Sequence, residues 1–332
     1  MKDMIRLFFG LIPIVAQALN YEVIPLVADT NIAPNVDPNL INPWGLFFVP
    51  NGNFWVADNG SDVSTLYQPN GEIINFVIKV PSATGAVINP FTNQFIIKSP
   101  MNSAPARFFF SSEDGTILGF NSSVDPTSAV VAVDNSLSGS VYKGLALGKT
   151  CCQTYLFTTD FFNRKIDLFD HSFVLHGIIK DYTIPKDFAP FNIKNINDFL
   201  YVTYAKQRPP ENRDDDSGLG NGYVDIFSLT GNFIKRLISQ GNLNSPWGIA
   251  VAPSNFGEFS GALLIGNFGD GMINAYNPFS GAFLGTLTDI NNNPIVINGL
   301  WALEFDSKGT LYFSSGPNDE MNGLIGVIKP LP

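Results

Sequence analysis

The sequence predicts an all-β fold, a six-bladed β-propeller, from three observations. An apolar strand, a small polar loop and a second strand recur six times along the 332 residues, beginning near residues 54, 108, 155, 201, 263 and 311. The copies are separated by roughly 40 to 60 residues, a spacing typical of propeller blades. The chain also contains 30 glycines and 23 prolines, which suit many short strands joined by tight turns.

The first repeat contains the whole pattern of a blade. Four strands are expected at residues 44–50, 54–58, 63–67 and 73–80. Asn51-Gly52, between the first two, is a strong hairpin signal because both residues tolerate positive φ. We therefore expect four antiparallel strands in each blade.

The later blades follow the first with variations, at residues 84–133, 142–182, 189–239, 245–288 and from 299 onward. The last repeat has only three strands before the sequence ends. Residues 21–28 (YEVIPLVA) belong to no repeat and have the composition of a strand. We predict that this N-terminal strand is the outermost strand of the sixth blade and closes the ring.

The first 18 residues have the pattern of a secretory signal peptide. Lys2 and Arg6 form a basic start, residues 7–15 are apolar, and Ala16-Gln17-Ala18 is a cleavage signal. The sequence thus predicts a signal peptide at 1–18, a single propeller domain at 19–332, and secretion to the periplasm or the cell exterior. An apolar N-terminal helix that stays attached is the alternative. No later stretch has the length of a membrane span.

Charge and residue usage exclude several classes of function. The net charge of −10 repels phosphate backbones, which argues against a nucleic-acid partner. The two histidines, His171 and His176, are expected away from the loops described below, which argues against a Ser-His-Asp triad or a histidine metal site. The two cysteines, Cys151 and Cys152, are adjacent, so they are either free thiols or joined in a strained ring.

Strand alternation places one set of loops together. The loop entering the first strand and the loop leaving the second strand of every blade share one face, which we call the loop face. Aromatic, amide and acidic residues gather there around the mouth of the central channel. The predicted ligand-binding residues are Trp44, Asp58, Asn59, Glu113, Asp160, Trp247, Asn267, Asp270 and Trp301.

Two chemistries suit these residues. Carboxylates from several blades would suit Ca²⁺, and the candidate metal ligands are Asp58, Asp160, Asp270, Asp214 and Asp216. Alternatively, the acids cap turns and hydrogen-bond neighbouring loops, and the run 214–216 is a solvated loop. The three recurring tryptophans either pack between blades or form a platform on which a sugar stacks.

Several motifs also carry a family resemblance. NPWGL, FWVADNGSDVSTLY, SSEDGTILGF, YKGLAL, LNSPWGIAVAP, LIGNFGDGMINAY and NGLWALEF resemble those of a family of secreted bacterial β-propeller proteins. More distantly, the chain is similar to propellers with NHL repeats and to gluconolactonase-like propellers. The close resemblance implies the fold and secretion, and no particular activity. The gluconolactonase-like propellers hold a catalytic metal at this location, but their ligand set cannot be matched to this sequence residue by residue.

Two functions follow as hypotheses. The first is a secreted binding scaffold that recognises an extracellular protein or glycan through the loop face. The second is a lactonase-like hydrolase that uses loop-face carboxylates and a divalent cation. A purely structural role at a cell surface is a third.

Overall fold

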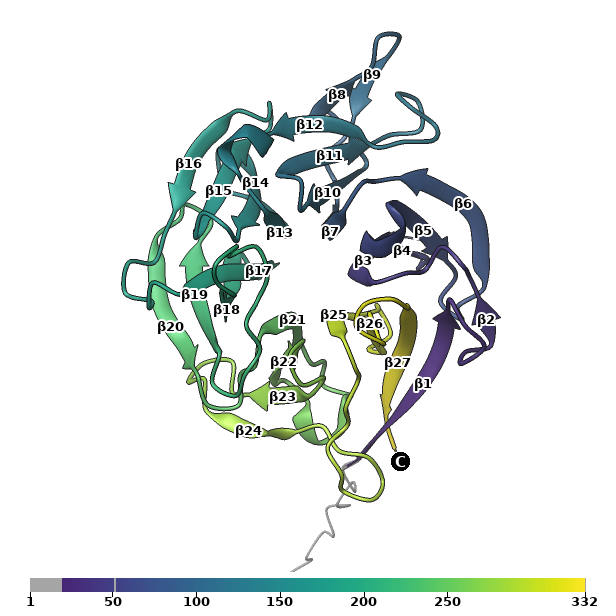
Figure 1. The fold of residues 1–332 in the computed structure, drawn as a ribbon, viewed down its shortest axis with the longest axis vertical. Coiled ribbons are helices and arrows are strands. Elements are labelled where there is room, and N and C mark those ends of the chain that lie inside the picture. The colour runs from purple at the N-terminus through teal and green to yellow at the C-terminus, as the bar shows by residue number, and fades with distance from the viewer. Residues whose placement is uncertain (1–19, 51, 332) are drawn as a thin grey trace, which may run out of the picture.

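The protein is a six-bladed β-propeller, as the repeats predict. The computed structural model describes residues 20–50 and 52–331, so the predicted signal peptide lies outside the described residues. Six antiparallel sheets surround a central axis, and the innermost strands β3, β7, β13, β17, β21 and β25 face that axis (Figure 1).

The blades follow the chain in order. Blade 1 comprises β3 (Pro43–Phe48), β4 (Phe54–Asp58), β5 (Val63–Tyr67) and β6 (Ile73–Lys79). Blade 2 comprises β7 (Ala83–Ile88), β10 (Phe108–Ser112), β11 (Thr116–Phe120) and β12 (Val130–Asp134). Blade 3 comprises β13 (Tyr142–Lys149), β14 (Thr154–Asp160), β15 (Lys165–Asp170) and β16 (Leu175–Ile179).

The second half continues in the same way. Blade 4 comprises β17 (Phe188–Ile196), β18 (Phe199–Lys206), β19 (Gly222–Ser228) and β20 (Phe233–Ser239). Blade 5 comprises β21 (Pro246–Val251), β22 (Leu263–Asn267), β23 (Ile273–Tyr276) and β24 (Phe283–Thr286). Three short 3₁₀ turns occur in the described residues: η1 (Asn59–Ser61), η2 (Ser136–Ser138) and η3 (Gly257–Phe259).

Blade 6 joins the two ends of the chain. It contains β25 (Leu300–Phe305), β26 (Leu311–Ser315) and β27 (Leu324–Pro330). Next to β27 lies the antiparallel strand β1 (Tyr21–Ala28), which the short strand β2 (Asn35–Val36) extends in parallel (Figure 1). The predicted closure by the N-terminal strand is therefore confirmed. It pairs β27 along its length and leaves no open seam in the ring.

Tyr21 anchors the closing strand to blade 5. Its ring is buried against Phe256 and Phe259, with centroids 4.9 and 6.1 Å away. Its hydroxyl donates a hydrogen bond to the carbonyl of Phe256 at 3.0 Å and accepts one from the amide of Phe259 at 3.2 Å. The first residue of β1 thus ties two blades together.

The innermost strands approach one another closely because a small residue recurs in them. Trp44, Lys143 and Trp247 are each followed by glycine. A Cβ added to Gly45 would lie 2.6 Å from the carbonyl oxygen of Thr84, and one added to Gly85 would lie 2.7 Å from the amide of Leu145. Such distances are prohibitive for a side chain, so glycine lets the strands of blades 1, 2, 3 and 5 approach their neighbours at the axis.

Blade 2 has an elaboration that the repeat pattern did not indicate. Between its first two strands, the chain forms the hairpin β8 (Ile96–Lys98) and β9 (Ser103–Pro105), which projects from the disc (Figure 1). Phe95 is fully buried at its base, with ring centroids 5.2 Å from Phe109 and 5.5 Å from Phe173.

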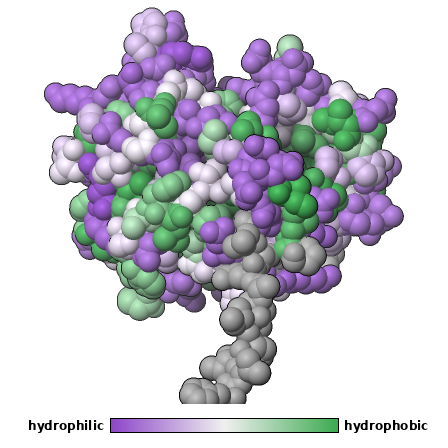
Figure 2. Space-filling view, turned by 90° about the horizontal axis from the view of Figure 1, so that it is seen from below, coloured by the Kyte–Doolittle hydropathy of each residue, from purple (hydrophilic) through white to green (hydrophobic). Residues whose placement is uncertain are grey.

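The rim of the disc has a mixed surface. Seen from its edge, hydrophobic residues form small separate areas among hydrophilic ones (Figure 2). Exposed apolar side chains on the outermost strands include Val77, Val131, Ile178, Ile234 and Leu284. Within the described residues, no helix is long and apolar enough to cross a membrane.

The closure gives a first prediction. A chain that begins at Asp29 lacks β1 and should be less stable by about 5 kcal/mol, because buried Tyr21, Val27 and Ala28 are removed and the β27 edge is exposed. A difference of this size corresponds to a melting temperature lower by about 10 °C. Thermal unfolding against a control chain that begins at Asn20 measures the effect, and equal melting temperatures would contradict the role of β1.

Candidate functional site

The mouth of the channel on the loop face holds a polar pocket of about 250 Å³. Every blade contributes to its wall, through the start of an innermost strand or the loop that leaves a second strand. The lining residues are Trp44, Glu113, Lys143, Arg208, Asp214, Asp215, Ser217, Phe268, Trp301 and Glu320. We call this the loop-face pocket.

Stacked aromatic rings form its floor. The ring centroids of Trp44 and Phe268 lie 3.8 and 4.0 Å from Trp301, both nearly parallel to it. These two rings form no ring pair with each other among the described residues, which puts them on opposite faces of Trp301. Trp247 meets both Trp44 and Trp301 edge-on, at 5.2 and 5.3 Å.

This packing decides between the two interpretations of the tryptophans. Trp44, Trp247 and Trp301 are all at least 96% buried, and they pack against one another where blades 1, 5 and 6 meet at the central axis, as the packing interpretation had it. Both faces of Trp301 are covered by other rings. The tryptophans therefore plug the channel, and Trp301 offers no open face on which a sugar could stack.

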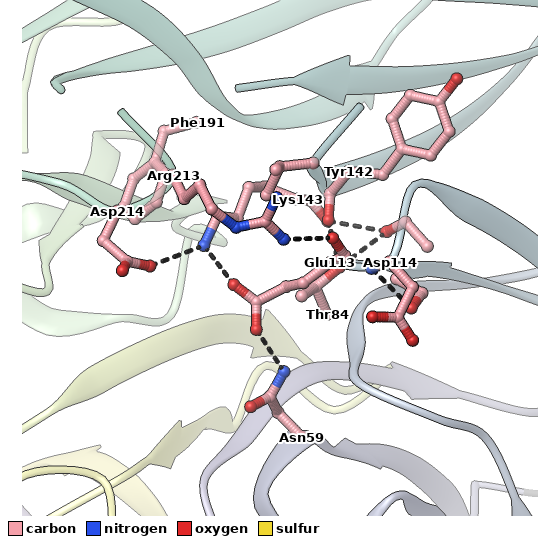
Figure 3. A network of polar contacts seen from close by, with 12 residues as sticks. Asn59, Thr84, Glu113, Asp114, Tyr142, Lys143, Phe191, Arg213 and Asp214 are labelled. Carbon is pink, nitrogen blue, oxygen red and sulfur yellow. Dashed lines mark hydrogen bonds and ion pairs between the residues drawn. The ribbon is translucent and has the colours of Figure 1, made fainter. Parts of the chain in front are cut away.

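Lys143 lies directly against this floor, and Figure 3 shows its ion pairs with Glu113 and Asp214. Its Nζ is 2.6 Å from Oε1 of Glu113, 3.5 Å from Oδ1 of Asp214 and 4.6 Å from the centroid of the Trp44 ring. The side chain is 1% exposed. Burial works against its charge, but the carboxylates of Glu113 and Asp214 outweigh that effect and hold the pKa of Lys143 above its usual range. Lys143 is thus a buried ammonium.

The partners of Lys143 are held in place by blades 1 and 4. Asn59, after β4, donates a hydrogen bond from Nδ2 to Oε2 of Glu113 at 3.0 Å (Figure 3). Arg213 donates to the backbone carbonyl of Glu113 at 3.0 Å. Asp214 also pairs with the guanidinium of Arg208 at 3.0 Å. The network fixes one carboxylate on each side of the ammonium.

The pocket contains more acids than bases. Its four carboxyl groups belong to Glu113, Asp214, Asp215 and Glu320, whereas its two cations are Lys143 and Arg208. Burial raises the pKa of Asp215 and that of Glu320 above their ordinary values. Neutral donors are their nearest partners: Ser217 Oγ is 3.0 Å from Asp215, and Asn42 Nδ2 is 2.6 Å from Glu320. Among the described residues neither carboxyl forms an ion pair, although the charge of Lys143 acts on both from a longer distance.

The structure brings together some of the residues that the sequence singled out and not others. Trp44, Glu113, Trp301 and Asp214 line the loop-face pocket, and Asn59 contacts it through Glu113. The remaining predicted residues lie outside its lining: Asp58, Asp160, Trp247, Asn267, Asp270 and Asp216.

Asp58 and Asp160 are fully buried within their own blades. Thr65 donates to Oδ2 of Asp58 at 2.7 Å, and burial raises the pKa of Asp58 well above its ordinary value. Asp160 accepts hydrogen bonds from Ser140 Oγ and Asn163 Nδ2, each at 2.8 Å. Asp160 thus holds the loop before β13 and the turn after β14 together, as the alternative interpretation had it, whereas Asp58 bonds the neighbouring strand β5.

Asn267 and Asp270 stabilise the loop after β22. Asn267 Nδ2 donates to the backbone carbonyl of Asn242 at 2.8 Å and to Oδ2 of Asp270 at 3.3 Å. Asp270 also accepts from the amide of Met272 at 3.0 Å. These hydrogen bonds stay within blade 5 and the loop that precedes it.

The five proposed metal ligands do not come together. Asp58, Asp160 and Asp270 lie in different blades, with the contacts just described. Within the run 214–216, Asp214 turns toward Lys143 and Arg208, whereas Asp216 pairs with Lys206 at 3.0 Å. Adjacent aspartates are thus held in different directions. Across the part of the chain that the structure describes, no group of three His, Cys, Asp or Glu side chains has the arrangement of a metal site.

The histidines and cysteines lie apart from the loop-face pocket. His171 is exposed in the turn after β15, and His176 in β16 has its Nε2 3.3 Å from the hydroxyl of Tyr155. Cys151 and Cys152 are exposed free thiols with sulfur atoms 3.0 Å apart, as the first of the two alternatives had it.

Sequence reasoning missed Lys143, Arg208, Ser217 and Phe268 as site residues. For Lys143 a signal was present. Blade 1 reads Trp44-Gly, blade 5 Trp247-Gly and blade 6 Trp301-Ala, whereas blade 3 reads Lys143-Gly at the same point of its innermost strand. A lysine in place of a channel-facing aromatic residue needs a carboxylate nearby, and that requirement points to Glu113.

Comparison with known proteins shows the family of the chain. It is 33% identical over 319 residues to Uncharacterized protein L690 of Acanthamoeba polyphaga mimivirus, covering 91% of this chain and 83% of that protein. It is also 33% identical over 317 residues to protein R648 of the same virus, covering 90% and 77%. The chain belongs to the family of these mimivirus proteins. No family model matches it. These relatives are viral, so the bacterial family implied by the motifs stays a prediction.

Solved structures of low identity share the fold. A streptogramin B lyase and the virginiamycin B lyase of Staphylococcus aureus each align with a TM-score of 0.56, at 10% and 15% identity. They cover 95% and 94% of this chain and 99% of their own chains. A protein of unknown function from Bacteroides thetaiotaomicron aligns with a TM-score of 0.61 at 11% identity, over 94% and 76%. At such identities the likeness supports the propeller architecture alone.

The buried ammonium gives a second prediction. Lys143→Met leaves Glu113 and Asp214 without their shared cation. It should lower the free energy of unfolding by about 2 kcal/mol, less than the ~3–5 kcal/mol for fully buried pairs because both acids reach solvent. Denaturant unfolding measures the loss, and the double variant Glu113→Gln/Lys143→Met should recover part of it. If Lys143→Met were as stable as the unmodified protein, the ion pairs of Lys143 would not contribute to stability.

Proposed function

We propose that the protein is a binding protein that receives a positively charged group of its ligand in the loop-face pocket. The observation that carries the proposal is the surplus of carboxyl groups there. Glu113 and Asp214 are matched by Lys143 and Arg208, but Asp215 and Glu320 have only neutral donors as nearest partners. A cation entering the pocket would supply the charge that these two groups lack.

The chemistry of the pocket favours an ammonium group. Its wall already holds one, since the Nζ of Lys143 lies between carboxylates and over the Trp44 ring. The same combination of acidic oxygens and aromatic rings binds amines in other proteins. A pocket of about 250 Å³ is small, and it would fit a short amine or one basic side chain of a partner protein. This supports the protein rather than the glycan form of the binding hypothesis.

Calorimetric titration with 1,4-diaminobutane at low ionic strength tests the proposal. We expect binding at one site, weakened at least about tenfold by Glu320→Gln and by Asp215→Asn, since a hydrogen bond to a charged group contributes roughly 1.5–3 kcal/mol. Glu22→Gln removes one negative charge from an exposed position on the rim and should leave the affinity unchanged. If all three variants changed the affinity equally, the diamine would be attracted by the acidic surface in general and not by the loop-face pocket, and the proposal would be wrong.

The affinity should also depend on pH in a defined direction. Burial raises the pKa values of Asp215 and Glu320, so both take up protons at a higher pH than exposed carboxyls do. Only the ionised forms attract the diamine, which stays fully charged below pH 8. Affinity should therefore be greatest near neutral pH and fall as the pH falls toward 4. Titrations from pH 7.5 to 4 check this, and an affinity that rises with acidity would contradict the assignment.

Secretion and a lactonase-like activity, the two other functions inferred from the sequence, remain proposals. Secretion rests on the pattern of residues 1–18, and a reporter fused after residue 18 would test export. The lactonase-like hydrolase rests on loop-face carboxylates, and Asp58 and Asp160, two of its candidates, are buried and hydrogen-bonded within their own blades.

A further inference from the structure

A second and larger pocket lies on the face opposite the loop face, between blades 1 and 2. Its volume is about 660 Å³. Apolar side chains make up most of its wall, among them Val49, Trp55, Leu66, Ile88, Phe91 and Phe108. A volume of 300–1,000 Å³ is typical of sites for small organic ligands. We call it the blade 1–2 pocket.

The insertion in blade 2 builds one side of this pocket. Phe91, Thr92 and Pro105 flank the hairpin β8–β9, and no other blade carries such a hairpin in the described residues. Two buried amides fix that wall. Asn89 Nδ2 donates to the carbonyl of Ala106 at 2.8 Å, and Asn121 Nδ2 donates to the carbonyl of Pro105 at 2.7 Å. The pocket is therefore held open by buried hydrogen bonds.

Arg107 is the only charged residue among the described residues that line the pocket. Its guanidinium has no hydrogen-bond or ion-pair partner within residues 20–50 and 52–331. The other four arginines in these ranges are all engaged: Arg164 with the carbonyl of Lys186, Arg208 with Asp214, Arg213 with the carbonyl of Glu113, and Arg236 with Asp181 and Asp225. Arg107 is therefore the one arginine in these ranges whose guanidinium is left without a partner.

We propose that the blade 1–2 pocket binds an amphipathic carboxylate. The apolar body of the ligand would lie against Trp55, Leu66 and Phe108, and its carboxylate would accept hydrogen bonds from Arg107. A guanidinium presents paired donors that match the two oxygens of a carboxylate, so one unpaired arginine at an apolar pocket selects this combination. The site is independent of the loop-face pocket, which lies at the other face and selects the opposite charge.

Decanoate, used below the concentration at which it forms micelles, is the probe. Calorimetric titration should show one molecule bound per chain, and the fluorescence of Trp55 should change on binding. Arg107→Gln should weaken decanoate at least about tenfold. Decanol, which has the same chain without the charge, should bind more weakly than decanoate and be unaffected by Arg107→Gln.

Two further variants test whether decanoate binds inside the pocket and whether any positive charge would do. Thr92→Trp places a large side chain in the pocket from an exposed position, so it should abolish decanoate binding without disturbing the core. Lys329→Gln removes one positive charge from an exposed position on β27 and should leave the affinity unchanged. Absence of binding by the unmodified protein, binding that ignores both Arg107→Gln and Thr92→Trp, or several molecules bound per chain would each overturn the proposal.

Discussion

Convergence of six innermost strands on one axis is the constraint on which the rest of the molecule depends. At the loop face each strand contributes one side chain to a limited space, and the glycine that follows in blades 1, 2, 3 and 5 lets the backbones meet. Aromatic residues fill that space in blades 1, 4, 5 and 6, whereas blade 3 supplies Lys143. The channel is therefore closed on this side by rings and one ammonium, and the loop-face pocket lies above them.

The placement of a charge at the plug determines the electrostatics of the loop face. A buried ammonium requires carboxylates, and blades 2 and 4 supply them through Glu113 and Asp214. The surplus acids, Asp215 and Glu320, then remain without a cation at a half-buried position. On the opposite face the unpaired charge is positive, because Arg107 is the charged residue that lines the apolar blade 1–2 pocket. The two pockets thus carry opposite unpaired charges.

The features that recur along the chain could be predicted from the sequence, whereas the roles of single side chains could not. The blades and the closing strand Tyr21–Ala28 are repeated or complete a repeat, so the sequence alone indicated them. The loop face followed from strand alternation, and Trp44, Glu113, Trp301 and Asp214 do line its pocket. The roles of individual acids did not follow, because a turn-capping Asp160 and a pocket-lining Asp215 look alike in sequence. Side-chain direction, set by neighbours such as Ser140 or Ser217, separates them.

Lys143 is a charged anchor beneath the loop-face pocket, and its charge is the property on which the electrostatics of that pocket depend. The most direct test is a nuclear magnetic resonance titration of the lysine side chains, with the Lys143 signal assigned by its absence in Lys143→Arg. We expect Lys143 to stay protonated to a higher pH than the exposed lysines, because Glu113 and Asp214 favour its charge. Loss of its proton near pH 8, ahead of the others, would contradict the account and point to amine chemistry.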